Sequence, residues 1–166
     1  MGESLRSKAL RFLFNLYPCF RRTGARLTYI AADGLEVRLR LPLNWTTRGY
    51  WGTTFGGSMY AAIDPVFLVM LSRALGRSYL VWDRAAHIDF KRPGRSTLSA
   101  TFRLDPDDLD ALRAEILRRP STVREYRVDL VDEKGIVHAS CVKTLYIRRA
   151  REKSAAATPA EVPVTT

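Results

Sequence analysis

The sequence has few cysteines and no long hydrophobic run. Cys19 and Cys141 are its two cysteines among 166 residues, which excludes a disulfide framework and fits a reducing compartment. The longest apolar run near the N-terminus covers three residues, Phe12 to Phe14, and is too short for a signal-peptide core. The most apolar segment, 58–75, is interrupted by charged residues and a proline, so we expect no membrane span. These absences predict one cytoplasmic domain, long enough to bury a core without covalent cross-links.

The positive charge is concentrated in three segments. The net charge is +10, and residues 1–26 contribute +5, while residues 84–95 and 148–153 contribute +3 each. Local basicity of this kind attracts phosphate, anionic lipid or nucleic acid. The chain lacks a zinc-finger cysteine set, an RNP-like aromatic motif and a basic helix followed by heptads. Nucleic-acid binding is therefore disfavoured.

Hydrophobic periodicity predicts an α+β chain. Residues 4–20 fit a short amphipathic helix that Pro18 should end. We expect further helices over 58–75 and 106–118, and strands over 25–32, 35–41, 78–91, 96–104, 122–132 and 136–148. The segment after Ala150 is small, polar and proline-bearing, which is typical of a disordered tail. The predicted divisions are an N-terminal helix packed on the domain (1–20), the main domain (21–149) and the tail (150–166).

The segment 58–75 is apolar on all sides of a helix, so most of its surface must be buried. One antiparallel sheet covers only one side of such a helix. We therefore expect a second copy of the chain to cover the other side, in a homodimer or a tetramer. Asp64 lies inside this apolar segment, where an unpaired carboxylate would be costly and must find water or a partner.

Two stretches carry a resemblance to a known family. "GTTFGGSMYAAID" (52–64), followed by "HIDFKRPG" (87–94), resembles the hotdog-fold acyl-CoA thioesterases, and is most similar to an uncharacterised branch known as a domain of unknown function. Those enzymes have the pattern Asn-x-x-Gly-x-x-His-Gly-Gly, with an Asp seven positions after the last Gly. The matching positions are Gly52, Gly56, Gly57 and Asp64, whereas Gly49 and Phe55 stand in place of the Asn and the His. The resemblance implies a hotdog fold, in which an antiparallel sheet wraps around one long helix.

The resemblance also implies hydrolysis of an acyl-CoA or acyl-ACP thioester, without a cofactor or a metal. The N–H groups of Gly57 and Ser58 would hold the oxyanion at the start of the helix. Gly56 would allow a carbonyl to approach the backbone closely. Asp64 lies about 10 Å further along the helix, so it would act across the dimer interface, as general base on a water or as nucleophile.

Each of these residues has a structural alternative. Asp64 is either catalytic or a structural acid bonded to the loop, to Arg84 or to Arg92. The hydroxyl groups beside the glycines either replace the missing His or cap the helix; they belong to Thr53, Thr54 and Ser58. A basic cluster either holds the phosphates of CoA or forms a solvated edge; it consists of Lys91, Arg92 and Arg95.

The aromatic residues and histidines near these motifs have alternatives too. The aromatic side chains either line an acyl or pantetheine channel, with Phe55 and Trp51 nearest the glycines, or belong to the core; the others are Trp45, Tyr50 and Trp82. His87 and His138 fall on expected strands outside any nucleophile motif. We interpret both as histidines with structural partners.

Three classes of function remain. The first is a dimeric hotdog thioesterase. The second is a non-catalytic hotdog protein that binds acyl thioesters or lipids, because Gly49 and Phe55 replace two polar residues of the pattern. The third is a scaffold without a ligand. A dehydratase is disfavoured, since its chemistry calls for a His and none lies in the motif.

Overall fold

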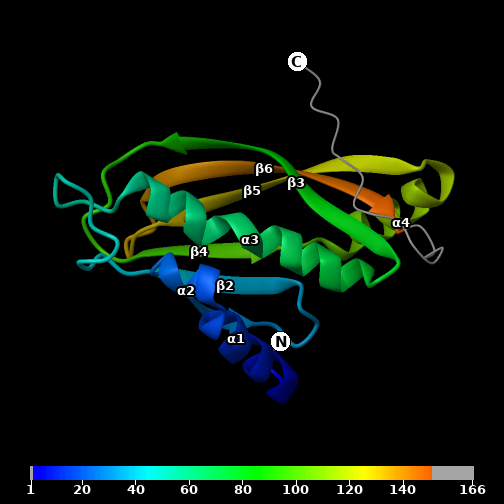
Figure 1. Ribbon diagram of the computed structural model, residues 1–166, viewed down its shortest axis with the longest axis horizontal. Coiled ribbons are helices and arrows are strands. Elements are labelled where there is room, and N and C mark those ends of the chain that lie inside the picture. The colour runs from blue at the N-terminus through cyan, green and yellow to red at the C-terminus, as the bar shows by residue number, and fades with distance from the viewer. Residues whose placement is uncertain (1, 151–166) are drawn as a thin grey trace.

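The computed structural model describes residues 2–150 and has one long helix lying against a six-stranded antiparallel sheet (Figure 1). The strand order is β1-β2-β4-β5-β6-β3. The elements, in chain order, are α1 (Leu5–Leu16), α2 (Pro18–Arg22), β1 (Arg26–Ile30), β2 (Glu36–Leu41), α3 (Gly56–Leu75), β3 (Tyr79–Phe90), β4 (Leu98–Arg103), α4 (Pro106–Arg118), β5 (Ser121–Val131) and β6 (Val137–Arg149). The predicted tail lies outside the described residues except for Ala150.

The α+β class and all six expected strands are confirmed, and the element bounds differ by a few residues. Two differences have local causes. The helix α3 begins at Gly56 rather than Ser58, since glycines can occupy its first turn. Pro18 ends the N-terminal helix as predicted, because α1 stops at Leu16 and Tyr17, the residue before the proline, is not helical. The difference is that Pro18 also occupies the first position of a second helix, α2. Proline is favoured there because the first N–H groups of a helix have no intrahelical partner.

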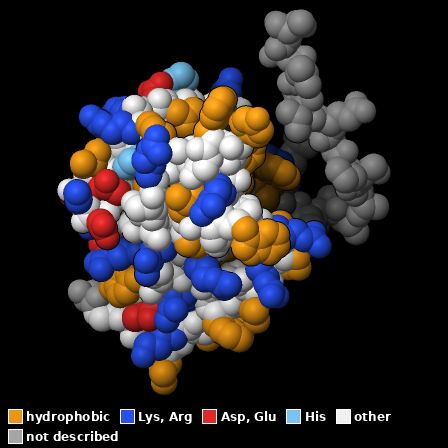
Figure 2. All heavy atoms as spheres, turned by 90° about the vertical axis from the view of Figure 1, so that its left-hand side faces the viewer, with side chains coloured by type: hydrophobic (Ala, Val, Ile, Leu, Met, Phe, Trp, Pro, Cys, Tyr) orange, Lys and Arg blue, Asp and Glu red, His pale blue; other side chains and the backbone are white. Residues whose placement is uncertain are grey.

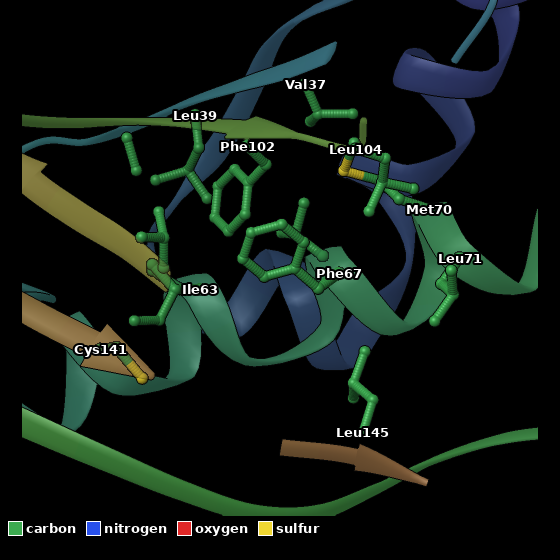
Figure 3. Close-up of a cluster of buried hydrophobic side chains, with 14 of the residues drawn as sticks. Val37, Leu39, Ile63, Phe67, Met70, Leu71, Phe102, Leu104, Cys141 and Leu145 are labelled. Atoms are coloured by element: carbon green, nitrogen blue, oxygen red, sulfur yellow. The ribbon is translucent and has the colours of Figure 1, made fainter. Parts of the chain in front are cut away.

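The core lies between α3 and the sheet. Phe67 of α3 packs its ring against Phe102 of β4 and Tyr126 of β5, with ring centroids 5.0 and 5.1 Å apart (Figure 3). The other side chains that α3 buries are Met59, Ala62, Ile63, Val66, Met70, Leu71 and Leu75. By length and composition alone α3 could cross a membrane. The core helix of a globular domain meets the same criterion. In this structure the buried face of α3 packs on the sheet.

The edge of the sheet at β1 is covered by α1. The side-chain amide of Asn15 donates to the carbonyl of Leu27 (2.9 Å) and accepts the N–H of the same residue (2.8 Å). The carboxylate of Glu3 accepts the N–H of Ile30 at 3.2 Å. Polar side chains of α1 and of the segment before it therefore bond to backbone groups of β1 that a neighbouring strand would otherwise satisfy.

The opposite edge, at β3, is open. This strand has 12 residues and pairs with β6 on one side. In the part of the chain that the structure describes, no strand pairs with its other side. All residues from Trp82 to His87 are exposed. A long exposed edge strand is a template for pairing with another chain, so this edge supports the expected homodimer.

We expect Ala85→Glu to convert the dimer to a monomer. Ala85 lies near the middle of β3 and is exposed. Two copies related by a two-fold axis would bring their new carboxylates close together. Light scattering should show a dimer for the wild type and for the control Thr101→Glu, which adds the same charge at an exposed position of β4. A wild-type monomer at micromolar concentration would contradict the prediction.

Candidate active site

The first turn of α3 is not capped by a side chain among the described residues. Phe55 occupies the N-cap position and has no hydrogen-bonding side chain. Neither Thr54 nor Ser58 caps the helix, so the capping interpretation of these hydroxyls is wrong. The first intrahelical bond is that of Met59 N–H to the Phe55 carbonyl, at 3.1 Å. The earlier N–H groups of the turn have no partner within the helix, and the helix dipole adds partial positive charge there.

Two aromatic rings lie directly on the glycines of this turn. A Cβ atom on Gly57 would lie 2.3 Å from the ring of Phe55, and one on Gly56 would lie 3.1 Å from the ring of Phe90. Any larger residue at Gly57 would displace the Phe55 ring. The position where the family pattern has a His therefore places an apolar ring beside the helix start.

A groove of about 260 Å³ runs from this turn to the basic cluster. It is lined by Thr54, Gly56, Met59, Phe90, Lys91, Arg92 and Pro93. Predicted site residues from two segments that are distant in sequence thus meet beside α3; they are Thr54, Gly56, Lys91 and Arg92. The view from this end of the molecule has Lys and Arg side chains among hydrophobic ones, with few acidic side chains (Figure 2).

Backbone bonds hold the two sides of the groove together. The N–H of Thr54 donates to the carbonyl of Gly94 at 2.8 Å. A Cβ atom on Gly94 would lie 2.7 Å from the Thr54 hydroxyl, so only glycine allows this approach. The N–H groups of Lys91 and Arg92 both donate to the carbonyl of His138, at 2.8 and 3.1 Å. The basic turn is therefore fixed next to the start of α3.

Both histidines have structural partners, as predicted. His138 is buried, and its ring nitrogens lie 3.1 Å from the Pro93 carbonyl and 3.2 Å from the carboxylate of Asp132. His87 is exposed and lies 3.1 Å from the carboxylate of Asp89.

Several predicted residues lie outside the groove. Thr53 lies in the loop before α3, where its carbonyl accepts the N–H of Gly49 at 2.7 Å. Arg95 is exposed. The aromatic side chains are more than half exposed, so assigning them to the core is wrong; they are Trp45 (89%), Tyr50 (94%), Trp51 (85%) and Trp82 (59%). A separate cavity of about 220 Å³ between α1 and α3 contains none of the predicted site residues.

Asp64 forms an ion pair with a residue that sequence reasoning missed. The ammonium group of Lys143, in β6, lies 2.5 Å from Asp64 and 2.7 Å from Asp83 of β3. Lys143 is fully buried, whereas the side chains of Asp64 and Asp83 remain 40% and 30% exposed. The expected partners were wrong, because Arg92 instead donates to the Val137 carbonyl.

The two carboxylates keep Lys143 charged. Burial disfavours the ammonium form, but the hydrogen bonds to Asp64 and Asp83 outweigh it and raise the pKa of Lys143 above its ordinary value. Tyr60 lies on the same side, with its ring centroid 5.4 Å from the ammonium. Burial and then hydrogen bonding to Asp64 raise the pKa of the Tyr60 phenol, which remains protonated.

A β-bulge in β3 brings Asp83 to the cluster. Ala86 is opposite Lys143 and Ala85 is opposite Thr144, but the next paired residue is Asp83, opposite Leu145. Arg84 is the extra residue. A strand without a bulge would turn position 84 toward α3, because successive side chains alternate between faces. The bulge therefore places an acid, rather than an arginine, beside the buried lysine.

The alternation of β6 contains the signal for Lys143. Its inward positions are otherwise apolar and buried, at Ala139, Cys141, Leu145 and Ile147. A lysine in that register must find a counter-charge in the core. The sequence thus contains a signal for a buried cation in β6. Asp64, the acid inside the apolar helix, was a candidate partner for that cation.

Solved structures with the same fold include thioesterases and proteins of unknown function. A probable thioesterase of unknown function from Pseudomonas aeruginosa superposes with a TM-score of 0.78 at 20% identity, over 90% of this chain and 99% of its own. A thioesterase from Haemophilus influenzae gives a TM-score of 0.67 at 14% identity, over 93% and 98% of the two chains. A protein of unknown function from Chlorobaculum tepidum gives a TM-score of 0.69 at 16% identity, over 87% of this chain and 95% of its own. The fold is therefore the hotdog fold that these structures share.

The chain belongs to the family described as a domain of unknown function, DUF4442, whose pattern matches residues 6–147. No curated protein sequence matches the chain.

We expect the two acids of the ion cluster to be coupled in stability. Asp64→Asn or Asp83→Asn alone leaves Lys143 with one carboxylate, and each should lower the free energy of unfolding by about 1 kcal/mol, since both acids are partly exposed. The double variant leaves a buried ammonium without a counter-charge and should lose about 3 kcal/mol or more. Chemical denaturation of the four proteins measures this coupling. Strictly additive losses would contradict the cluster.

Proposed function

We propose that the protein is a homodimeric, cytoplasmic enzyme that hydrolyses an acyl-CoA or acyl-ACP thioester. The groove that joins the uncapped start of α3 to Lys91 and Arg92 carries this proposal. One end of the groove suits a thioester carbonyl, and the other suits the phosphates of a carrier. The similarity of the fold to those of a probable thioesterase and a thioesterase supports the same chemistry.

In the proposed reaction, the thioester carbonyl lies against the first turn of α3. The N–H groups of Gly57 and Ser58 would stabilise the oxyanion that forms when water attacks the carbonyl carbon. Collapse of this intermediate breaks the C–S bond and releases the acid and the thiol of the carrier. The exposed aromatic residues of the loop 42–55 would line the pantetheine channel once a second copy covers them.

Asp64 would accept the proton of the attacking water. Its carboxylate is fixed by Lys143 yet 40% exposed, so a water molecule can reach it. Asp64 is about 10 Å along the helix from Gly57 of the same chain, so it would serve the Gly57 of the second copy. Direct attack by Asp64 on the carbonyl is the alternative role for the same group.

A non-catalytic, thioester-binding protein is the second candidate. The ring of Phe55 lies on Gly57 and offers no polar group where the family pattern has a His. In addition, one oxygen of Asp64 is engaged by Lys143. An inactive wild type that binds acyl-CoA would favour this candidate.

We expect Asp64→Asn to lower thioester turnover by about 10² or more, as for loss of a general base. Asp83→Asn is the matched control, since it removes the same charge from the same lysine but lies in β3 rather than in α3, the helix that carries the proposed oxyanion site. Neither acid lines the groove itself. Steady-state hydrolysis of a panel of acyl-CoA substrates measures both variants. Equal losses in the two variants would assign Asp64 a structural role only.

We expect Arg92→Ala to raise the KM for acyl-CoA by about tenfold, as for loss of one charged hydrogen bond to phosphate. A short acyl-pantetheine, which lacks the nucleotide, should show little change. The effect should grow at low salt, because exposed charges are then less screened. Arg118→Ala removes an equivalent exposed charge on α4 and serves as the control. Equal effects on both substrates would contradict a role for Arg92 in binding the carrier.

A further inference from the structure

The helix α1 has a second apolar face that the domain does not cover. Its inner face contributes Leu10 and Phe14 to the core. The outer face is formed by side chains seven, eight and eleven positions after Leu5, which lie on one side of a helix. These residues and their exposed fractions are Leu5 (84%), Phe12 (63%), Leu13 (64%) and Leu16 (48%), and Tyr17 (63%) follows them. We call this set the outer α1 face.

Basic side chains surround the outer α1 face. Arg6 and Lys8 are exposed on α1 itself. The rings of Phe14 and Phe20 pack edge to face at 4.7 Å, which holds α2 against the end of α1. The exposed Arg21 and Arg22 of α2 therefore lie beside the same helix end.

The helices α1 and α2 contain no acidic residue. Glu3 is the one acidic residue among residues 1–26. Its carboxylate is turned to the inner side, where it binds the guanidinium of Arg11 at 2.7 Å and the backbone of β1. The side chain of Glu3 is only 13% exposed. The outer α1 face is thus apolar at its centre, and the exposed charged side chains that α1 and α2 place around it are all cationic.

We propose that the outer α1 face docks on the surface of an anionic lipid membrane. A helix with an apolar stripe and Lys or Arg at its borders lies in the interface, with its apolar side chains among the acyl chains and its cations at the head groups. The charge distribution disfavours a second copy as the occupant, because two such faces would bring their arginines together. The strand order also separates this surface from the expected dimer contact, since β1 and β3 are the opposite edges of the sheet.

Membrane docking would bury the apolar side chains of the outer α1 face, whereas nucleic-acid binding would use only the cations around it. A polyanion without acyl chains would engage Arg21 and Arg22 and leave Leu13 and Phe12 in water. The four exposed apolar residues are unexplained in that case, so lipid accounts for more of the surface.

Flotation with vesicles tests the proposal directly. The full chain should float with vesicles of phosphatidylcholine and phosphatidylglycerol, and binding should weaken with salt and on pure phosphatidylcholine. Leu13→Ser should weaken binding to the anionic vesicles by about tenfold, since one buried leucine is lost. The matched control is Leu117→Ser, at an exposed leucine of α4 with 69% exposure, and it should bind as the wild type does.

The basic margin is tested in the same assay. The double variant Arg21→Gln/Arg22→Gln should lose about tenfold in binding to anionic vesicles, whereas Arg118→Gln/Arg119→Gln, at the end of α4, should not. A second readout uses Cys19, which is exposed while Cys141 is buried. An environment-sensitive dye on Cys19 should shift to shorter wavelengths with anionic vesicles.

Three results would overturn the proposal. The first is equal vesicle binding by Leu13→Ser and Leu117→Ser. The second is tighter binding to duplex DNA than to vesicles, with no effect of Leu13→Ser on either. The third is a change of oligomeric state in Leu13→Ser, measured by light scattering, with vesicle binding unchanged. Thioester hydrolysis in solution is measured separately, so a failure of docking is distinguishable from a failure of the proposed activity.

Discussion

The buried ammonium group of Lys143 is the constraint on which much of this structure depends. A cation without access to water must have counter-charges within hydrogen-bond distance, and here they come from two other elements, at Asp64 in α3 and Asp83 in β3. The cluster therefore fixes the rotation of the central helix relative to the sheet. It also fixes the register of β3, because only the bulge at Arg84 turns Asp83 toward the lysine.

The same ion pairs connect the stability of the fold to its chemistry. Asp64 stands at the acid position of the thioesterase pattern, and its carboxylate is also one of the two groups that neutralise Lys143. Because two carboxylates neutralise one ammonium group, Asp64 can also bind a substrate or a water molecule. Asp83 then remains hydrogen-bonded to Lys143. The partial exposure of Asp64 and Asp83, against the full burial of Lys143, is consistent with this division.

Local patterns were sufficient to predict the elements of the fold, because alternation and helical periodicity depend on neighbouring residues. The resemblance to the thioesterases placed Gly56 and Arg92 in one predicted site, and in the structure both residues line one groove. The partner of Asp64 was missed because Lys143 is 79 positions away in sequence, and the bulge that selects Asp83 leaves no local signature. The exposure of Trp45 and Tyr50 was missed for a different reason: aromatic composition does not distinguish a core from a surface that another molecule covers.

The two edges of the sheet differ, and this difference sets how far the sheet can extend. An antiparallel sheet with two bare edges can add copies at both sides and grow into a filament. Here the β1 edge is occupied by Asn15 of α1 and by Glu3, just before that helix, which bond to the backbone groups that an incoming strand would need. If two copies pair through their β3 strands, the outer edges of the combined sheet are the two β1 strands. Because both β1 edges are already bonded to side chains, no further copy can add there. The N-terminal segment would thus limit such an assembly to two copies.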